Sequence, residues 1–489
     1  MQKLRYIVFY FLSFSLHLSA QQSWGFINSN YAGVSTVDLN PSAMVFSNLG
    51  WDINVLSADV SVLNNSFYNS PKFALPLLFK QQINIGVANT SNVSKLTNDD
   101  FIIHANIQTN TFLNLAVNIK GPSVMFTNGN SAFAFTTGFR EGTSITGTPK
   151  NLTRLAYENL VYGDLYNQSL SVPNGTNIAV MVWSEIGISY AHKLTDDYFS
   201  LFSGGISLKF LSGYAGGYAI SRGIDYTVPY ASNFTGTNLN LDYGHAVHNE
   251  NNPVMLSNPI GSGISTDLGI TYIRKKKPKK GPYYPCPDPT GMSASYVPPR
   301  NYKWKLGASL LDVGSISFKT DAVAYSYSSA AFSWDNATNV IPKTLKGIDS
   351  LIAIHFVSTN TSSPKNFFQI WLPTALSMQF DYNYNDVIYF NTSFVQRLVL
   401  TSDAHLNRMN SIAITPRYET YNFEVAMPII LNEYVYPNLG LMIRYRYFFI
   451  GTDQLGSTLG FTDLYGLNVY AGIKISHFGY TRKDPKMVY

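Results

Sequence analysis

The chain has 489 residues with a net charge of +5, and 13% of them are charged while 15% are aromatic. A soluble domain usually carries about 25% charged residues, so this composition argues against one. The weak net charge gives no indication of a nucleic-acid partner. The single cysteine, Cys286, excludes a small fold held together by internal disulfides.

Residues 1–20 have the pattern of a secretory signal peptide. Lys3 and Arg5 form a positive start, residues 6–18 form an apolar stretch, and Ala20 supplies the small residue before cleavage. The apolar stretch is too short to span a bilayer, and no later segment reaches about 20 unbroken apolar residues. We therefore expect an exported protein without a transmembrane helix.

The segment at 21–50 is nearly uncharged and rich in turn-forming residues. Pro41 cannot donate a ladder hydrogen bond, and Gly33 and Asn40 favour turns. Asp38 is the only charge, so burial costs little if its carboxylate finds donors. We expect residues 22–46 to lie inside a barrel mouth as a hatch; the alternative is a disordered periplasmic tail. The residues assigned to this hatch are Asn30, Tyr31, Gly33, Asp38, Asn40 and Pro41.

From residue 51 onward the sequence alternates with period two, which is typical of strands. In 131–140, Phe133 and Phe135 share one face and small residues such as Ala132 and Ala134 share the other. Thirteen such segments occur: 51–63, 110–120, 131–140, 181–193, 199–211, 264–274, 302–318, 372–384, 387–398, 410–418, 422–430, 439–449 and 466–478. Bacterial outer-membrane barrels have an even number of strands, so we expect about 14, with the missing one in 83–109 or 218–229.

The pattern predicts an all-β fold, a closed antiparallel transmembrane β-barrel over 51–489 in the outer membrane. Long connections at 141–180, 213–261 and 319–366 alternate with short turns. Such barrels carry long loops outside and short turns on the periplasmic side. The basic, Pro-rich insertion at 274–300 is interpreted as a solvated linker; the alternative is contact with an anionic partner.

Several stretches resemble an uncharacterised family of Bacteroidota outer-membrane β-barrels, a domain of unknown function. They include "NYAGVSTVDLNPSAM" at 30–44, "WSEIGISYAHKL" at 183–194, "KLGASLLDVGSISF" at 305–318 and "FIGTDQL" at 449–455. The segment Asn40-Pro41-Ser42 is also distantly similar to one in FadL-type channels and in the type IX secretion barrel. In those proteins this stretch folds back as a hatch, which the resemblance implies here.

Charged residues within the predicted strands are candidates for the lumen, and these are Glu185, Lys209, Asp267, Arg397 and Arg444. They fit a gate or ion-pair ladder, or simply the polar interior of a barrel. His245 and His248 match no strong metal template and are expected to be exposed loop residues. No nucleophile elbow, phosphate loop or Cys-x-x-Cys pair occurs, so we expect no enzyme, no cofactor and no metal.

Two functions fit these observations. The first is a non-enzymatic component of an envelope assembly, in secretion, motility or membrane-protein biogenesis. Its partners would be outer-membrane lipid and other envelope proteins, and not nucleic acid. The second is a FadL-like channel for small hydrophobic molecules, which requires an apolar pocket beneath the hatch.

Overall fold

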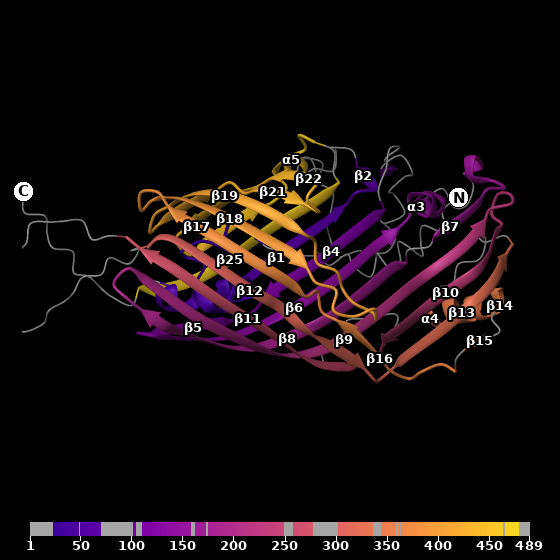
Figure 1. The fold of residues 1–489 in the computed structure, drawn as a ribbon, viewed down its shortest axis with the longest axis horizontal. Coiled ribbons are helices and arrows are strands. Elements are labelled where there is room, and N and C mark those ends of the chain that lie inside the picture. Colours follow the sequence, from indigo (N-terminus) through magenta and orange to yellow (C-terminus); the bar gives the residue numbers. More distant parts are fainter. Residues whose placement is uncertain are drawn as a thin grey trace, which may run out of the picture.

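Most of the chain forms one antiparallel sheet closed into a barrel (Figure 1). The computed structural model describes residues 23–47, 49–69, 101–103, 110–157, 162–172, 175–248, 258–276, 302–335, 344–357, 360–361, 363–462 and 465–478. The sheet closes where the first strand pairs with the last, from Leu49 opposite Phe478 to Leu63 opposite Gly466. The signal peptide predicted at 1–20 lies outside the described residues.

Within the described residues the wall has fourteen strand positions, in chain order around the ring, as predicted. They are β1 (Leu49–Asn64), β4 with β5 (Thr111–Lys120, Ser123–Asn128), β6 (Ser131–Thr148), β8 (Thr176–Asp196), β9 (Ser200–Thr227), β10 with β11 (Phe234–Val247, Gly261–Lys275), β12 with β13 (Tyr302–Phe318, Ala322–Trp334), β16 with β17 (Phe368–Trp371, Ala375–Asn383), β18 (Ile388–Arg397), β19 (Ser411–Glu419), β20 with β21 (Phe423–Ala426, Ile429–Asn432), β22 with β23 (Tyr436–Leu439, Leu441–Tyr445), β24 (Phe448–Thr452) and β25 (Gly466–Phe478).

Shorter elements lie inside or beyond the wall. They are η1 (Gly33–Asp38), η2 (Pro41–Phe46), β2 (Phe67–Asn69), β3 (Phe101–Ile103), α3 (Lys150–Tyr157), η6 (Gly163–Leu165), β7 (Ser169–Val172), α4 (Leu345–His355), β14 (Phe356–Val357), β15 (Asn360–Thr361) and α5 (Leu455–Leu459). None of the helices in the described residues is long and apolar enough to cross a membrane.

The wall has an apolar outer face and a polar or small inner face, as the alternation predicts. Phe133 is 52% exposed whereas its neighbour Ala132 is fully buried. On β9, Leu208 is 39% exposed whereas Ser207 and Lys209 are buried. A closed barrel satisfies its own backbone, and an apolar outer surface suits it to lipid. The protein is therefore an outer-membrane barrel.

The fourteenth strand of the closed sheet is β24, so the expectation that it lies in 218–229 is wrong, because residues 218–227 continue β9. Most of 83–109, the other range expected to hold it, lies outside the described residues. The segment 439–449, predicted as one strand, turns at Arg446 and Tyr447 and continues as β24 beside β23. Arg446 makes this turn with a positive φ of 49° and donates its N–H to the Asn422 carbonyl (2.8 Å). No Gly, Pro, Asn or Asp marks the turn, so the sequence gives little warning of it.

The long connection predicted at 213–261 is largely strand, and the one at 319–366 contains the strand β13 and the helix α4. Residues 213–227 continue β9, and β10 pairs with that continuation and with β13, so 213–261 and 319–366 extend the wall on one side (Figure 1). The extension has its own apolar core, in which Tyr226, Phe234 and Phe332 are in ring contact. The connection predicted at 141–180 is shorter than expected, because β6 runs to Thr148 and β8 starts at Thr176.

Short turns gather at one end of the barrel, at 129–130, 197–199, 384–387, 420–422 and 446–447. Outer-membrane barrels place such turns in the periplasm. The basic insertion departs from this same end, because Lys275 forms an ion pair with Asp196 beside the 197–199 turn. This connection is therefore an exception to the expectation that long loops lie outside. Residues 277–301 lie outside the described residues.

Candidate functional site

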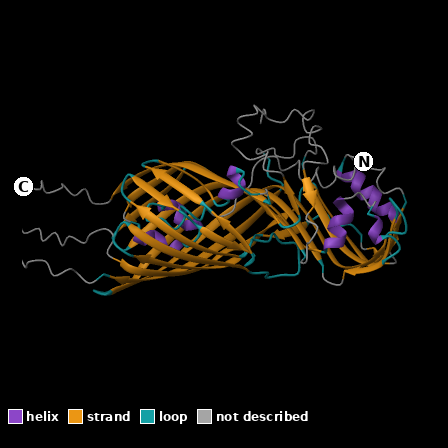
Figure 2. Cartoon of the chain, turned by 90° about the horizontal axis from the view of Figure 1, so that it is seen from above, coloured by secondary structure: helices purple, strands orange, loops and turns teal. Residues whose placement is uncertain are grey.

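The segment 23–47 lies inside the periplasmic half of the barrel (Figure 2). Its apolar side chains are buried against the inner wall; Val34 and Met44 have no exposed surface and Trp24 has 2%. We call this segment the hatch, as predicted. Its short 3-10 helices, η1 and η2, allow the chain to double back within a confined lumen.

Asn40 both starts η2 and ties it to the wall. Its Oδ1 accepts the Ser42 backbone N–H (3.1 Å), and Pro41 occupies the first helical position, where no donor is needed. Its Nδ2 donates to Gln379 (3.1 Å) and to Thr271 (3.2 Å). The Asn-Pro pair is therefore a cap and an anchor at once.

Gly33 lies where the hatch approaches β1 most closely. It has a φ of +53°, and a Cβ there would be 2.1 Å from Asp52 Oδ2. That carboxylate accepts a hydrogen bond from the Val34 N–H (2.6 Å) and forms an ion pair with Lys474 (2.9 Å). A side chain at this position would be strained and would also displace Asp52.

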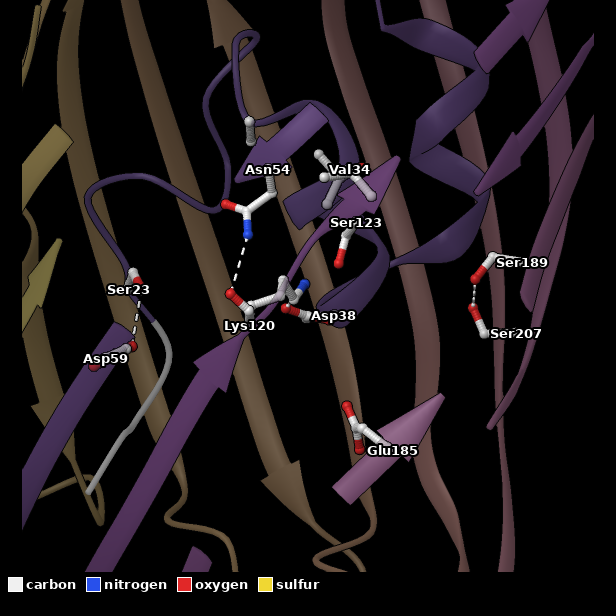
Figure 3. A network of polar contacts seen from close by, with 12 residues as sticks. Ser23, Val34, Asp38, Asn54, Asp59, Lys120, Ser123, Glu185, Ser189 and Ser207 are labelled. Atoms are coloured by element: carbon white, nitrogen blue, oxygen red, sulfur yellow. Dashed lines mark hydrogen bonds and ion pairs between the residues drawn. The ribbon is translucent and has the colours of Figure 1, made fainter. Parts of the chain in front are cut away.

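The other predicted hatch residues also contact the wall. Asn30 Nδ2 donates to Glu419 (2.8 Å). The Arg444 guanidinium lies 4.1 Å from the Tyr31 ring centroid. Asp38, the lone charge, forms an ion pair with Lys120, beside which it lies in Figure 3. The donor that its burial required is thus supplied by β4.

An ion cluster lies above the hatch and includes three of the predicted lumen residues. Lys209 contacts Asp267 (2.7 Å) and also Asp312 (2.9 Å). Glu185 contacts Arg140 (3.3 Å), which in turn contacts Asp312 (3.0 Å). The central residue, Asp312, was not among the predicted site residues.

Asp312 is strained as well as buried. Its φ is +52°, and the β11–β12 register shifts between Thr266 and Leu268. Its backbone N–H donates to Asp267 Oδ1 (2.7 Å) and its side chain is 2% exposed. Strained residues of this kind cluster at functional sites. Aspartate tolerates positive φ better than most residues, which permits this geometry.

The remaining candidates lie elsewhere. Arg397 pairs with Glu433 (3.2 Å) at the outer end, and Arg444 pairs with Glu424 (2.8 Å) at the periplasmic end. His245 is on β10 rather than in a loop and contacts Asp349 of α4 (3.0 Å). No group of three or more potential metal ligands occurs in the part of the chain that the structure describes.

His248 contacts Asp321 (2.7 Å) in the same outer extension, so both histidines have carboxylate partners. Burial, with the Asp349 carboxylate beside it, raises the pKa of Tyr243 above its usual range. These groups stabilise the extension and lie away from the ion cluster.

Residues 398–410, between β18 and β19, cross the lumen to the opposite wall, and we call them the inward loop. Asn114 donates to the Asn407 carbonyl (2.7 Å), and Asn177 donates to the His405 carbonyl (2.9 Å). Arg408 reaches Asp312 (2.5 Å), so the loop is joined to the ion cluster. From the sequence, residues 399–409 were expected only to connect the strands predicted at 387–398 and 410–418.

A cavity of 130 Å³, the chamber, lies between the hatch and the inward loop. The hatch contributes Trp24 and Phe26, and the inward loop contributes Leu406 and Arg408. Further lining side chains come from the wall and include Lys120, Arg140, Trp183, Glu185, Lys209, Asp312 and Phe449. The chamber therefore combines aromatic surface with charge.

Two buried donors beside the chamber lack partners among the described residues. They are the Trp183 indole Nε1 and the Arg408 Nη1. An unpaired buried donor costs about 1–3 kcal/mol, so such groups call for an acceptor that is not protein. The arrangement suits a small ligand with an apolar body and an accepting group.

Comparison with known proteins identifies one matching family and several similar solved structures. A family described as "Family of unknown function (DUF5723)" matches residues 41–453. No curated protein matches the chain. Solved structures that resemble it include a TodX deltaS2S3 mutant monoaromatic hydrocarbon channel, at 9% identity over 92% of this chain and 95% of that one, with a TM-score of 0.42.

Two further similar structures are a toluene transporter and a FadL homologue. The toluene transporter TbuX of Ralstonia pickettii is 9% identical over 95% of this chain and 98% of its own, with a TM-score of 0.38. The Pseudomonas aeruginosa FadL homologue is 10% identical over 94% and 98%, with a TM-score of 0.35.

Proposed function

The chain belongs to the DUF5723 family of unknown function, and we propose that this member is a gated outer-membrane channel for small ligands. The observation that carries the proposal is the chamber between the hatch and the inward loop. A barrel that served only as a scaffold would need neither a cavity nor two separate closures.

The chamber is closed in this structure. Its 130 Å³ is below the range of about 300–1,000 Å³ that is usual for small-molecule sites. A ligand therefore enters only when one closure moves. Of the two, the inward loop faces the outer end, so its displacement admits a ligand from outside.

Arg408 attaches the inward loop to the wall through an ion pair with Asp312. Its pair with Asp312 is largely buried, since the two side chains are 15% and 2% exposed. Replacing Arg408 by Ala removes this attachment and leaves the wall strands unchanged. The released loop should then move away from the hatch, which would enlarge the chamber on its outer side.

Solute influx into proteoliposomes tests the proposal. Purified barrel with Arg408→Ala should admit a small aromatic solute such as benzyl alcohol faster than wild type, and both faster than empty liposomes. Arg222→Ala removes an ion-paired arginine of the outer extension that does not line the chamber, and it is the matched control. Influx equal to that of empty liposomes for wild type and Arg408→Ala alike would overturn the proposal.

An envelope-assembly role is a second candidate, and the outer extension supports it. Its strands and α4 lie at the end of the barrel opposite the periplasmic turns, where an envelope partner would contact it (Figure 1). Purification in mild detergent should recover stoichiometric envelope partners. A monomer free of partners would count against this role and leave the channel unaffected.

A further inference from the structure

A second and larger cavity lies at the periplasmic end. Its volume is 340 Å³, within the range of small-molecule sites. We call it the vestibule. It is bordered by the 420–422 and 446–447 turns, and its lining includes Phe26, Tyr31, Arg444, Arg446, Phe449 and Lys474.

One aromatic pair separates the vestibule from the chamber. Phe26 of the hatch and Phe449 of β24 line both cavities. Their rings stack with centroids 3.9 Å apart and planes at 10°. They are 2% and 6% exposed, so the two rings together close the space between the cavities.

The hatch turn holds Phe26 against this part of the wall. Trp24 N–H donates to Asp453 (3.1 Å), and Phe26 N–H closes a local turn onto Ser23. A Cβ at Gly25 would be 2.5 Å from Met442 Cβ, so only glycine lets the turn approach β23 so closely. The hatch turn thus holds Phe26 against Phe449 of the wall. A small shift of this turn would separate the two rings.

The vestibule lining carries three cations and no carboxylate. Arg444 and Lys474 are each paired with one carboxylate behind the lining, Glu424 and Asp52. Arg446 has no carboxylate within ion-pair distance among the described residues. Among the described residues, Arg446 therefore adds a positive charge that only an aromatic ring accompanies, the Tyr445 ring at 5.7 Å.

Aromatic rings supply the rest of the surface, from Phe26, Phe449 and three tyrosines. Cations beside aromatic faces suit a ligand with a flat apolar body and an anionic group. We infer that the vestibule is an exit site for a small aromatic carboxylate, which reaches it from the chamber when Phe26 separates from Phe449. This inference rests on the proposed channel function and names its substrate class and its periplasmic gate.

Benzoate is the probe, and benzyl alcohol is its neutral counterpart. Binding is measured by titration of the whole purified barrel in detergent. Arg446→Gln should weaken benzoate binding by about three- to tenfold and leave benzyl alcohol unaffected. Lys276→Gln removes a cation from the same end outside the vestibule and is the matched control. Equal benzoate affinity in wild type and Arg446→Gln would overturn the anion site, and so would equal affinity for inorganic phosphate and benzoate.

The gate is tested by influx of benzoate into proteoliposomes. Phe449→Leu keeps apolar volume but removes the ring stack, and it should raise benzoate influx. Phe448→Leu, on the lipid side of the same strand and 58% exposed, should not. Phe26→Leu, which alters no wall strand, should act as Phe449→Leu does. Heat-modifiable migration on detergent gels verifies that each variant is folded.

The outcomes distinguish a failure of the proposed exit site and gate from a failure of the proposed channel function. If benzyl alcohol enters wild-type proteoliposomes but none of the vestibule or gate variants changes benzoate binding or influx, the inference is wrong and the channel stands. If no solute enters faster than into empty liposomes, even with Arg408→Ala, the channel itself is wrong.

Discussion

The hatch and the inward loop close one lumen from opposite ends, but they are held differently. The hatch is fixed by hydrogen bonds spread around the ring, such as Ser29 to Glu424 (2.8 Å) and Ser203 to the Ser42 carbonyl (3.1 Å). The inward loop is also held by hydrogen bonds, such as Asn114 to the Asn407 carbonyl (2.7 Å), and by one largely buried ion pair, Arg408 to Asp312. Replacing the single side chain of Arg408 removes the whole charged attachment of the loop. We therefore expect the loop to be the easier closure to open.

The largest effect is expected at the loop's single charged attachment. Asp312→Asn removes the carboxylate that serves Arg140, Lys209 and Arg408, and breaking a buried pair costs about 3–5 kcal/mol. Asparagine also tolerates positive φ, so the backbone is preserved. The free energy of unfolding in urea should fall by this amount. Asp321→Asn is the control, since Asp321 has a φ of 51° but a 43% exposed side chain; an equal loss there would contradict the comparison.

A second prediction concerns the wall that carries the ion cluster. Leu208→Arg should cost about 2–4 kcal/mol if the residue lies near the bilayer midplane. Lys209→Arg keeps a cation inside the lumen and should cost less. The same urea titration measures both. Equal tolerance at 208 and 209 would show that the cluster does not face the lumen.

The hatch should be loosened by a new steric contact with the wall rather than by the loss of a charge. Gly33→Ala places a Cβ against Asp52, whereas Gly129→Ala, at a φ of 57°, meets nothing within 4 Å. Left-handed backbone costs a residue with a Cβ about 1–2 kcal/mol at either site. Only Gly33→Ala should expose residues 31–46 to limited proteolysis. Protection in both variants would mean that the hatch is less closely fitted than the structure indicates.

The smallest effect on influx is expected at one anchoring residue of the hatch. Asn40→Ala removes a helix cap, worth about 1 kcal/mol, together with the hydrogen bonds to Gln379 and Thr271. Solute influx should not rise, because the other contacts remain. Arg408→Ala is the comparison variant in the same liposome measurement. A rise as large as that of Arg408→Ala would show that the hatch is no more securely held than the loop.

The alternation and composition of short segments predicted those features of the fold that depend on residues close together in the chain. Alternation identified the lipid face of β6 and β9, and the low charge of 21–50 predicted burial in the lumen. It missed β24, because Arg446 and Tyr447 are not typical turn residues. It also missed the inward loop and Asp312, since these depend on partners far away in the chain. Arg140, Lys209 and Arg408 are far from Asp312 in the chain, and the closed barrel brings them into contact with it.

Two separate closures bound one chamber. Cross-linking each closure to the wall tests this arrangement, in a background where Cys286 is replaced by Ser. One pair, Ser42→Cys with Thr271→Cys, joins the hatch to the wall where the hydroxyls lie 2.7 Å apart. The other, Asn407→Cys with Thr146→Cys, joins the inward loop where the side chains lie 3.1 Å apart.

Influx of benzyl alcohol is then measured before and after a short bifunctional thiol reagent is added. Either link alone should stop influx, and the single-cysteine variants treated in the same way should not be affected. Undiminished influx with both pairs linked would contradict the claim that the solute passes both closures.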